Sequence, residues 1–393
     1  MTVTAGSVPD IAARVRAALP AIAANAAEGE RRRWIADENI DLLTEAGFFR
    51  LTVPREFGGV DASAAEQFPL IAELAAACPS TAWVCVTWAA HVWMVRLYPA
   101  AAQREILTRD SVRVVGAFSP TGTLTPADGG YRLSGSWKWN SGVRGADWAT
   151  VAAHIGDVDP GGPPRLGYTL VPACELAIHD DWHAMGLAGT GSSMVTADDV
   201  FVPAHRVMPI HDLITGKYAA DATIGDGRGY AFFPLLLTLG SGLYAGMARG
   251  ALNAFLARVP GRAITYTPWA DQAQHPHVQI QTASAAARIE AAEALGGRLV
   301  SRLQDSADTG EPLSPADRSW FRGITGAVIS LCREAVELLW SMAGGSAIML
   351  DVPLQRYFRD VESLALHAIM APDANFETYG RSLLGLDPGT PFL

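Results

Sequence analysis

The spacing of hydrophobic residues divides the chain into three parts. Over residues 8–110 apolar positions recur three and four apart, the period of helices, and glycine and proline mark the turns. Near residue 112 the period changes to two, and beyond residue 228 the helical period returns. The β-type runs are 113–118, 131–139, 148–154, 166–171 and 194–201, and the long helical segments are 231–258, 275–305, 314–342 and 353–384. This order predicts helices, then a small β-domain, then a bundle of four long helices.

The richest local pattern is the tryptophan-containing stretch at residues 137–148. In the strand that leads into it, Tyr131, Leu133, Gly135, Trp137 and Trp139 share one face at period two, and the residues between them are polar or charged. The pattern predicts a half-buried strand that runs into a loop. Its aromatic rings, small residues and single hydroxyl suit contact with a flat conjugated ring such as a flavin. A hairpin whose tryptophans only fill a core is the alternative.

Composition narrows the classes of function. The 393 residues are 49% hydrophobic and 18% charged, which favours a large core or a surface hidden in an oligomer. The formal net charge of -10 argues against binding to nucleic acid or to an anionic membrane. No signal peptide or membrane span is visible, and the four cysteines show no disulfide or metal spacing, so we expect a cytoplasmic protein. His275 and His277 lack a third ligand, and no metal is expected.

Several motifs occur in the order of a known family. They are residues 116–122, 131–142, 181–193, 200–203 and 356–360, with His367 after them. With these motifs the chain resembles the acyl-CoA dehydrogenase fold and, more narrowly, the group D flavin-dependent monooxygenases built on it. These are the oxygenase components of two-component systems, similar to the 4-hydroxyphenylacetate and dibenzothiophene monooxygenases. The resemblance implies a mainly α fold with an N-terminal helical domain (1–111), a small β-barrel domain (112–224) and a C-terminal four-helix bundle (225–393).

One departure separates the chain from many dehydrogenases of this fold. Those enzymes carry a glutamate base near the C-terminus, and counting back from Arg381 by their spacing leads to Ala368, next to His367. No carboxylate stands there to take the α-proton of an acyl thioester. Glu362 and Glu377 are close in sequence but lie outside the family motif. Dehydrogenation of an acyl-CoA is therefore the alternative and not the leading hypothesis.

The resemblance implies three catalytic candidates. Ser141 matches the hydroxyl at flavin N5, although its sequence alone fits a turn serine before Gly142. His91, in an otherwise apolar helix, matches a histidine near the flavin C4a edge; a hydrogen-bonded core histidine is the alternative. His367 matches a base for a phenolic or indolic proton, and its seven-residue distance from Asp360 places both on nearly one helical face. A histidine at the end of a helix that stops before the following proline is the alternative for His367.

The same resemblance implies a set of cofactor-binding residues. Two loops of small residues would approach the flavin with their backbone, though each also fits an ordinary turn. Arg356 belongs to a charged cluster with Arg359 and Asp360, and Arg262 and Gln279 are weaker candidates for a neighbouring flavin. The full set is Phe118, Ser119, Thr121, Gly122, Trp139, Asn140, Ser141, Gly189, Thr190, Ser192, Ser193, Gly344, Gly345 and Arg356.

Together these features predict a reduced-flavin-dependent monooxygenase that acts through a C4a-hydroperoxyflavin. It would use reduced FAD or FMN and molecular oxygen to hydroxylate a small aromatic or polycyclic compound, in biosynthesis or catabolism. No Gly-x-Gly-x-x-Gly follows a strand and opens a helix, so a separate NAD(P)H-flavin reductase would supply the flavin. The resemblance implies a homotetramer, a dimer of dimers. Oxygenation at nitrogen or sulfur and a scaffold protein that has lost flavin are further alternatives.

Overall fold

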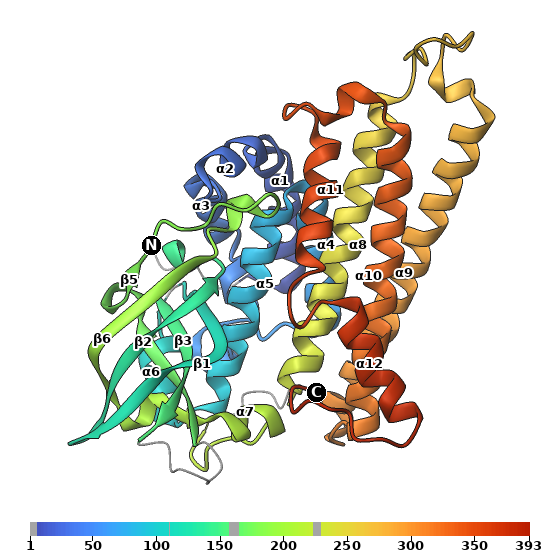
Figure 1. Cartoon of the computed structure of the whole chain (residues 1–393). Helices are drawn as coiled ribbons and strands as arrows, with labels where there is room; N and C mark the ends of the chain where they lie inside the picture. The colour runs from blue at the N-terminus through green and yellow to red at the C-terminus, as the bar shows by residue number, and fades with distance from the viewer. Residues whose placement is uncertain (1–5, 110, 157–164, 223–228) are drawn as a thin grey trace.

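The computed structural model describes residues 6–109, 111–156, 165–222 and 229–393, and begins with a layer of helices. Ser7 and Ser63 start two of them with capping boxes, in which each serine and the acidic residue three positions later bond each other's backbone N–H. The helices are α1 (Val8–Ala24), α2 (Ala26–Arg32), α3 (Asp37–Ala46), α4 (Ala64–Ala77), α5 (Pro79–Met94) and α6 (Ala100–Leu107). Helix α5 is buried on all sides and packs against both the sheet and the bundle (Figure 1).

A seven-stranded sheet forms the second part, and every predicted β-run lies in a strand. The strands are β1 (Val114–Ala127), β2 (Gly130–Asn140), β3 (Trp148–Ile155), β4 (Leu166–Pro172), β5 (Ala177–Ile178), β6 (Ser193–Pro203) and β7 (Val207–Pro209), and a short helix α7 (Ile210–Thr215) follows. Their order is β5-β6-β2-β1-β3-β4-β7, with β1 and β3 parallel and the other pairs antiparallel. The described edge strands β5 and β7 do not pair, so the expected β-barrel is an open sheet in its hydrogen bonding.

The end of β2 corrects the prediction that five alternating residues share one face. Leu133 and Trp137 are fully buried, but Trp139 is 67% exposed with φ +65°. The pairing of β2 with β6 shifts register between Trp137 and Asn140, and this irregularity reverses the alternation. The loop therefore begins with an exposed indole on a strained backbone.

Five α-helices form the described third part, residues 229–393, where four were expected. They are α8 (Phe232–Arg258), α9 (Pro276–Thr309), α10 (Pro315–Met342), α11 (Pro353–Leu364) and α12 (Pro372–Leu383). The predicted segment 353–384 is broken: α11 ends at Leu364, residues 365–370 form turns, and α12 begins at Pro372 after the extended Ala371, with ψ 117°. His367 consequently lies in the turn between α11 and α12, and the shared helical face with Asp360 was wrong. In Figure 1, α12 turns away from the line of α11.

Helix α8 forms the centre of the molecule. It packs against α4, α5, α9, α10 and α11 (Figure 1). Of the described helices, none is both long and apolar enough to cross a membrane. The boundary placed between residues 224 and 225 lies outside the described residues.

Candidate active site

A line of hydrogen-bonded side chains links α5 to the turn after β2 and to the loop before β6. The Trp83 indole N–H donates to Ser141 Oγ at 3.0 Å. Ser141 Oγ and Ser192 Oγ lie 2.7 Å apart, as do Ser192 Oγ and Thr190 Oγ1. The Thr190 hydroxyl ends the line by donating to the Leu187 carbonyl at 2.8 Å. The structure thus brings Ser141, Thr190 and Ser192 together, as the resemblance implied.

The loop that carries Thr190 and Ser192 is held in a left-handed conformation. Leu187 has φ +50° and Gly191 has φ +52°, and Gly142 N donates to the Thr190 carbonyl at 2.9 Å. Leu187 N donates to Asp360 Oδ1, so α11 anchors the start of the loop. Full burial raises the pKa of the Asp360 carboxyl to about 7, against the opposing effect of that hydrogen bond.

His367 reaches the same place from the turn after α11. Its ring lies 5.3 Å from the Trp83 ring, edge to face, so Trp83 contacts both Ser141 and His367. Ile369 N donates to His367 Nδ1 at 3.3 Å, which places the proton of the neutral ring on Nε2. Desolvation lowers the pKa of His367 to about 4, although the side chain is only half-buried.

His91 is buried in α5 with one ring nitrogen unused. Nδ1 donates to the Thr87 carbonyl at 2.7 Å, so Nε2 carries a lone pair, and that atom has no hydrogen-bond partner among the described residues. Burial lowers the pKa of His91 to about 4 and keeps the ring neutral. Gly116 of β1 makes room for the ring, since an added Cβ would lie 2.3 Å from Nε2.

His91 and Trp83, the residue that His367 contacts, lie apart on one face of α5. Trp83, Thr87 and His91 follow each other at intervals of four on α5, so Trp83 and His91 lie about 12 Å apart along the helix axis. The His91 ring packs 5.7 Å from Phe118 and 5.8 Å from Phe232. The candidates therefore form two groups on α5, with Ser141 and His367 around Trp83 and His91 among aromatic rings.

The first predicted flavin loop has mixed surroundings. Phe118 is half-buried and stacks on Tyr168 at 5.1 Å, whereas Ser119 and Thr121 are exposed. Gly122 is required by packing, because a Cβ there would lie 2.2 Å from the Trp137 ring. Asn140 is fully buried and donates its amide to the carbonyls of Trp137 and Ser193, so it fastens the irregular end of β2.

The remaining predicted residues lie near the loop or at the end of the bundle. Gly189 approaches Ser80 at the start of α5, and Ser193 is fully buried. Arg356 pairs with Glu30 at 3.2 Å, and Arg359 pairs with the same carboxylate, so this cluster ties α11 to α2. These contacts are structural, and they leave a cofactor contact of Arg356 as a prediction.

Gly344 and Gly345 are exposed beyond α10, where two arginines gather. Arg258 donates to Ser346 Oγ at 2.6 Å and Arg262 donates to the same atom at 2.7 Å. The sequence had indicated Arg262 but missed Arg258, the last residue of α8.

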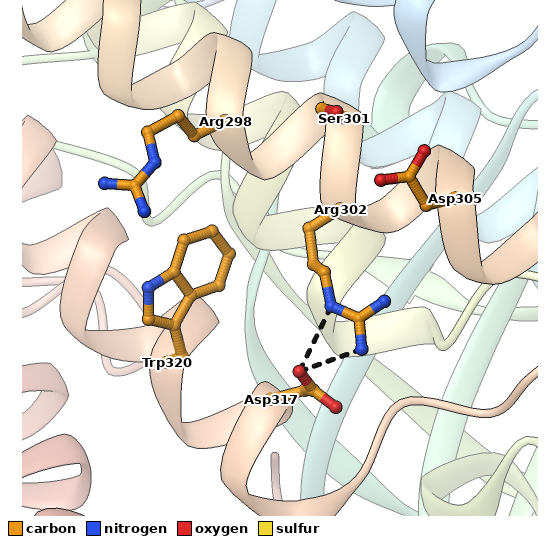
Figure 2. A pocket seen from close by; sticks show the side chains of 6 residues that line it. All are labelled: Arg298, Ser301, Arg302, Asp305, Asp317 and Trp320. Atoms are coloured by element: carbon orange, nitrogen blue, oxygen red, sulfur yellow. Dashed lines mark hydrogen bonds and ion pairs between the residues drawn. The ribbon is translucent and has the colours of Figure 1, made fainter.

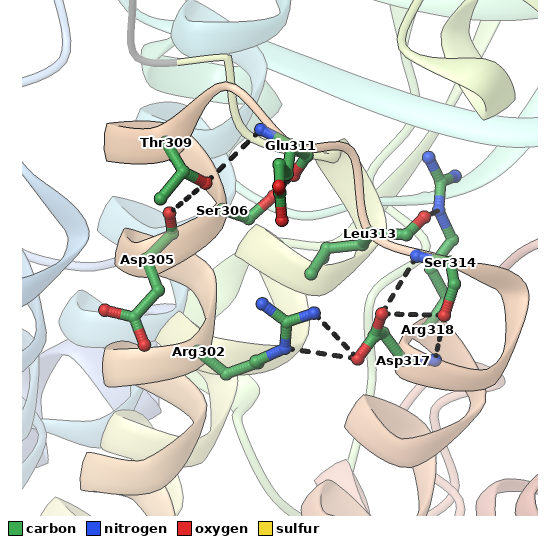
Figure 3. Close-up of polar contacts among 9 residues, drawn as sticks. All are labelled: Arg302, Asp305, Ser306, Thr309, Glu311, Leu313, Ser314, Asp317 and Arg318. Atoms are coloured by element: carbon green, nitrogen blue, oxygen red, sulfur yellow. Dashed lines mark hydrogen bonds and ion pairs between the residues drawn. The ribbon is translucent and has the colours of Figure 1, made fainter.

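Two surface hollows contain no candidate residue. Figure 2 shows one between α9 and α10, where Arg302 pairs with Asp317 and Arg298 lies over the Trp320 ring. Figure 3 shows the other contacts of Asp317, whose carboxylate also accepts hydrogen bonds from Ser314 N and Oγ in the capping box that starts α10. Arg302 and Asp317 thus serve the packing of α9 against α10.

In the second hollow, Asp180 pairs with Arg33 at 2.8 Å and Arg144 at 2.7 Å. These hydrogen bonds lower the pKa of Asp180.

Metal-binding side chains do not gather in the part of the chain that the structure describes, where no three His, Cys, Asp or Glu residues meet. His275 Nδ1 accepts from His277 N and caps the start of α9.

The residues present fit a planar aromatic cofactor. The exposed Trp139 indole offers a flat surface, Ser141 keeps one unused lone pair, and His91 Nε2 is a buried acceptor without a partner in the described structure. A buried polar atom in this state indicates a missing ligand or water. These groups are of the kind that a flavin ring, with its hydrogen-bonding edge, would contact.

Comparison with known proteins gives a consistent result. Two family models match, "Acyl-CoA dehydrogenase, N-terminal domain" over residues 10–111 and "Acyl-CoA dehydrogenase, C-terminal domain" over residues 240–372. The chain is 36% identical to the "FADH(2)-dependent resorcinol hydroxylase, oxygenase component" of Rhizobium sp. (strain MTP-10005), over 93% of this chain and 91% of that protein. It is 30% identical to the "Flavin-dependent monooxygenase, oxygenase subunit HsaA" of Mycobacterium tuberculosis, over 94% of each.

A solved structure gives the same picture. "XiaF from Streptomyces sp. in complex with FADH2 and Glycerol" superposes with a TM-score of 0.90 at 28% identity, and covers 98% of each chain. The expected mainly α fold with a central β-domain is thereby confirmed.

Proposed function

Because this chain belongs to the oxygenase components of flavin-dependent monooxygenases built on the acyl-CoA dehydrogenase fold, we propose that it hydroxylates a small aromatic compound with a phenolic or indolic ring. Reduced flavin, when bound, activates molecular oxygen for transfer to the substrate. Relatives named for resorcinol and for indole-3-acetate support the substrate class.

The observation that carries the proposal is the contact of Trp83 with both Ser141 and His367. It brings a hydroxyl suited to flavin N5 and a neutral histidine into one site. The only hydrogen bond that His367 Nδ1 accepts in the described structure is the long one from Ile369 N, and the ring can accept a phenolic proton there after that bond breaks. His91 Nε2, already free, would orient a polar group of the substrate or exchange a proton with it.

The two carboxylates that could replace the missing dehydrogenase base are engaged or exposed in the described structure. Glu362 on α11 is paired with Arg333 at 2.6 Å, and Glu377 on α12 is exposed to solvent. Neither carboxylate joins the cluster around Trp83. Oxygenation of nitrogen or sulfur uses the same flavin chemistry, and product analysis separates it from hydroxylation of carbon.

We further propose that reduced FAD or FMN comes from a separate NAD(P)H-dependent reductase.

We also propose a homotetramer. Hydrophobic side chains are exposed at the end of the bundle and near the C-terminus, among them Ile348, Leu350 and Leu384, and an oligomer would bury them. Gly344, Gly345 and Arg356 would then lie near the flavin of their own or a neighbouring subunit.

The experiment mixes the protein with reduced flavin, oxygen labelled with a heavy isotope, and resorcinol, 4-hydroxyphenylacetate or indole. We expect labelled hydroxylated product from at least one ring class, and strongly reduced product from His367→Asn while flavin is still oxidised. His277→Asn, at the start of α9, is the matched control. Oxidation of flavin without labelled product from any aromatic compound would contradict the proposal.

A further inference from the structure

The hydrogens in the line from Trp83 to Leu187 can point in only one direction. The Leu187 carbonyl can only accept, so the Thr190 hydroxyl must donate its single hydrogen to it. In the 2.7 Å hydrogen bond between Thr190 and Ser192, the donor must then be the Ser192 hydroxyl. By the same reasoning Ser141 donates to Ser192, and the Trp83 N–H donates to Ser141.

The Leu187 carbonyl at the end of this line determines whether Ser141 can donate or accept a hydrogen bond with a ligand. Its hydrogen is committed to Ser192, and one lone pair receives the Trp83 N–H. A single lone pair remains, so Ser141 can act toward a ligand only as a hydrogen-bond acceptor. Without Thr190 the shared hydrogens could reverse, because either serine could then be the donor.

Flavin N5 changes its hydrogen-bonding character with oxidation state. In reduced flavin N5 carries a hydrogen and donates, whereas in oxidised flavin N5 has only a lone pair. An acceptor-only hydroxyl matches the first and opposes the second, since two facing acceptors leave a buried polar group unsatisfied.

We propose that Thr190 and Ser192 are positioning residues that fix Ser141 as a hydrogen-bond acceptor, so that the site selects reduced over oxidised flavin. This inference rests on the proposed function, because it assumes that a flavin lies with N5 at Ser141. Full burial of Thr190 and near-complete burial of Ser192 protect the line from water, which could otherwise reverse it. The carbonyl at its end is held by the left-handed turn at Leu187 and by the anchor to Asp360.

The experiment measures dissociation constants for oxidised and for anaerobically reduced FAD and FMN, and compares their ratio among variants. Thr190→Val keeps the side-chain shape but removes the acceptor for Ser192. Ser192 can then donate back to Ser141, whose own hydrogen turns toward the flavin. We expect the preference for reduced flavin to fall roughly tenfold, about the worth of one hydrogen bond, with oxidised flavin binding more tightly. Thr190→Ser retains the hydroxyl and should restore the wild-type ratio.

Ser192→Ala tests the same line if Thr190→Val does not fold, and it should shift the ratio in the same direction. A purely structural role would weaken both flavin forms alike and leave the ratio unchanged, which would overturn the inference. Equal binding of both forms by the wild-type protein would also overturn it. Absence of binding of either form to the wild type would instead remove the proposed function.

Discussion

His91 is kept neutral by its surroundings, and this has a consequence that can be measured apart from activity. The ring is 2% exposed, and burial lowers its pKa to about 4 from an ordinary value near 6.5. Between these values the unfolded chain binds a proton that the folded protein does not. The contribution of His91 to stability is therefore full above about pH 6.5 and is lost as the pH falls toward 4.

We expect His91→Gln to weaken the loss of stability on acidification. The lowered pKa corresponds to about 3 kcal/mol of unfolding free energy in the wild type between about pH 6.5 and pH 4. Urea unfolding at several pH values measures this slope, and the difference between the two proteins isolates His91 from other titrating groups. His211→Gln, on the surface, is the control. Parallel slopes for the wild type and His91→Gln would show that folding does not lower the pKa of His91.

Ser141 can be tested through the speed of flavin oxidation. Each hydroxyl of the line keeps one unused lone pair, and Ser141 is the least buried of the three and lies two residues from the exposed Trp139. We expect Ser141→Ala to return oxidised-flavin absorbance about tenfold sooner after mixing the reduced, flavin-loaded protein with oxygen, since one hydrogen bond is lost. Ser330→Ala, whose hydroxyl bonds its own helix, should behave as wild type. An unchanged rate in Ser141→Ala would place flavin N5 elsewhere.

At the scale of elements, the sequence predicts the helices and strands that are long enough to show a clear hydrophobic period. The long helices α8, α9 and α10 and the five longer strands follow the hydrophobic pattern closely. The strands β5 and β7 were missed because two or three residues carry no readable period. The exposure of Trp139 could not be predicted either, because it depends on a register shift against β6.

The break between α11 and α12 matters for the site, and only its second edge was available in the sequence. Pro372 marks where α12 begins, whereas α11 already ends at Leu364, and His367 lies in the turn between them. In that turn the His367 ring contacts Trp83. The predicted position of His367, on the same helical face as Asp360, did not indicate this contact.

Packing of α12 depends on Gly323 of α10. A Cβ at that position would lie 2.1 Å from the Tyr379 ring, so the ring and α12 must move. We expect Gly323→Ala to lower the free energy of unfolding by about 1–3 kcal/mol, in spite of the better helix propensity of alanine. Gly297→Ala on α9 is the matched control. Its Cβ would meet no described atom within 4 Å, and it should stabilise by up to about 1 kcal/mol. Chemical denaturation compares the two, and equal effects would contradict this packing.

At the scale of the whole molecule, the site is assembled from segments far apart in the chain. Trp83, Ser141, Ser192 and His367 come from four elements or loops, and no local pattern places them together. Ser141, Ser192 and His367 were assigned to one site only through the resemblance to a family, and the part played by Trp83 was not predicted. The comparisons confirm the family. The direction of the hydroxyl line could not be predicted, since it follows from distances between side chains.

The end of the bundle gives a prediction about the cofactor and the assembly together. Arg258 and Arg262 meet at Ser346 beside exposed Gly344, and Arg258 Nε is buried without an acceptor in the described structure. Two guanidinium groups held this closely would suit the paired phosphates of FAD reaching from a neighbouring subunit.

We expect Arg258→Gln together with Arg262→Gln to weaken binding of reduced FAD by roughly tenfold or more, and that of reduced FMN much less, because FMN lacks the adenylate half. Arg298→Gln, in the hollow of Figure 2, is the control for a lost surface charge. Titrations with each flavin, at protein concentrations above and below dissociation of the oligomer, measure the effect. If a neighbour's arginines bind the cofactor, the preference for FAD disappears on dissociation even in the wild type. Equal losses for FAD and FMN would show that these arginines only stabilise the end of the bundle.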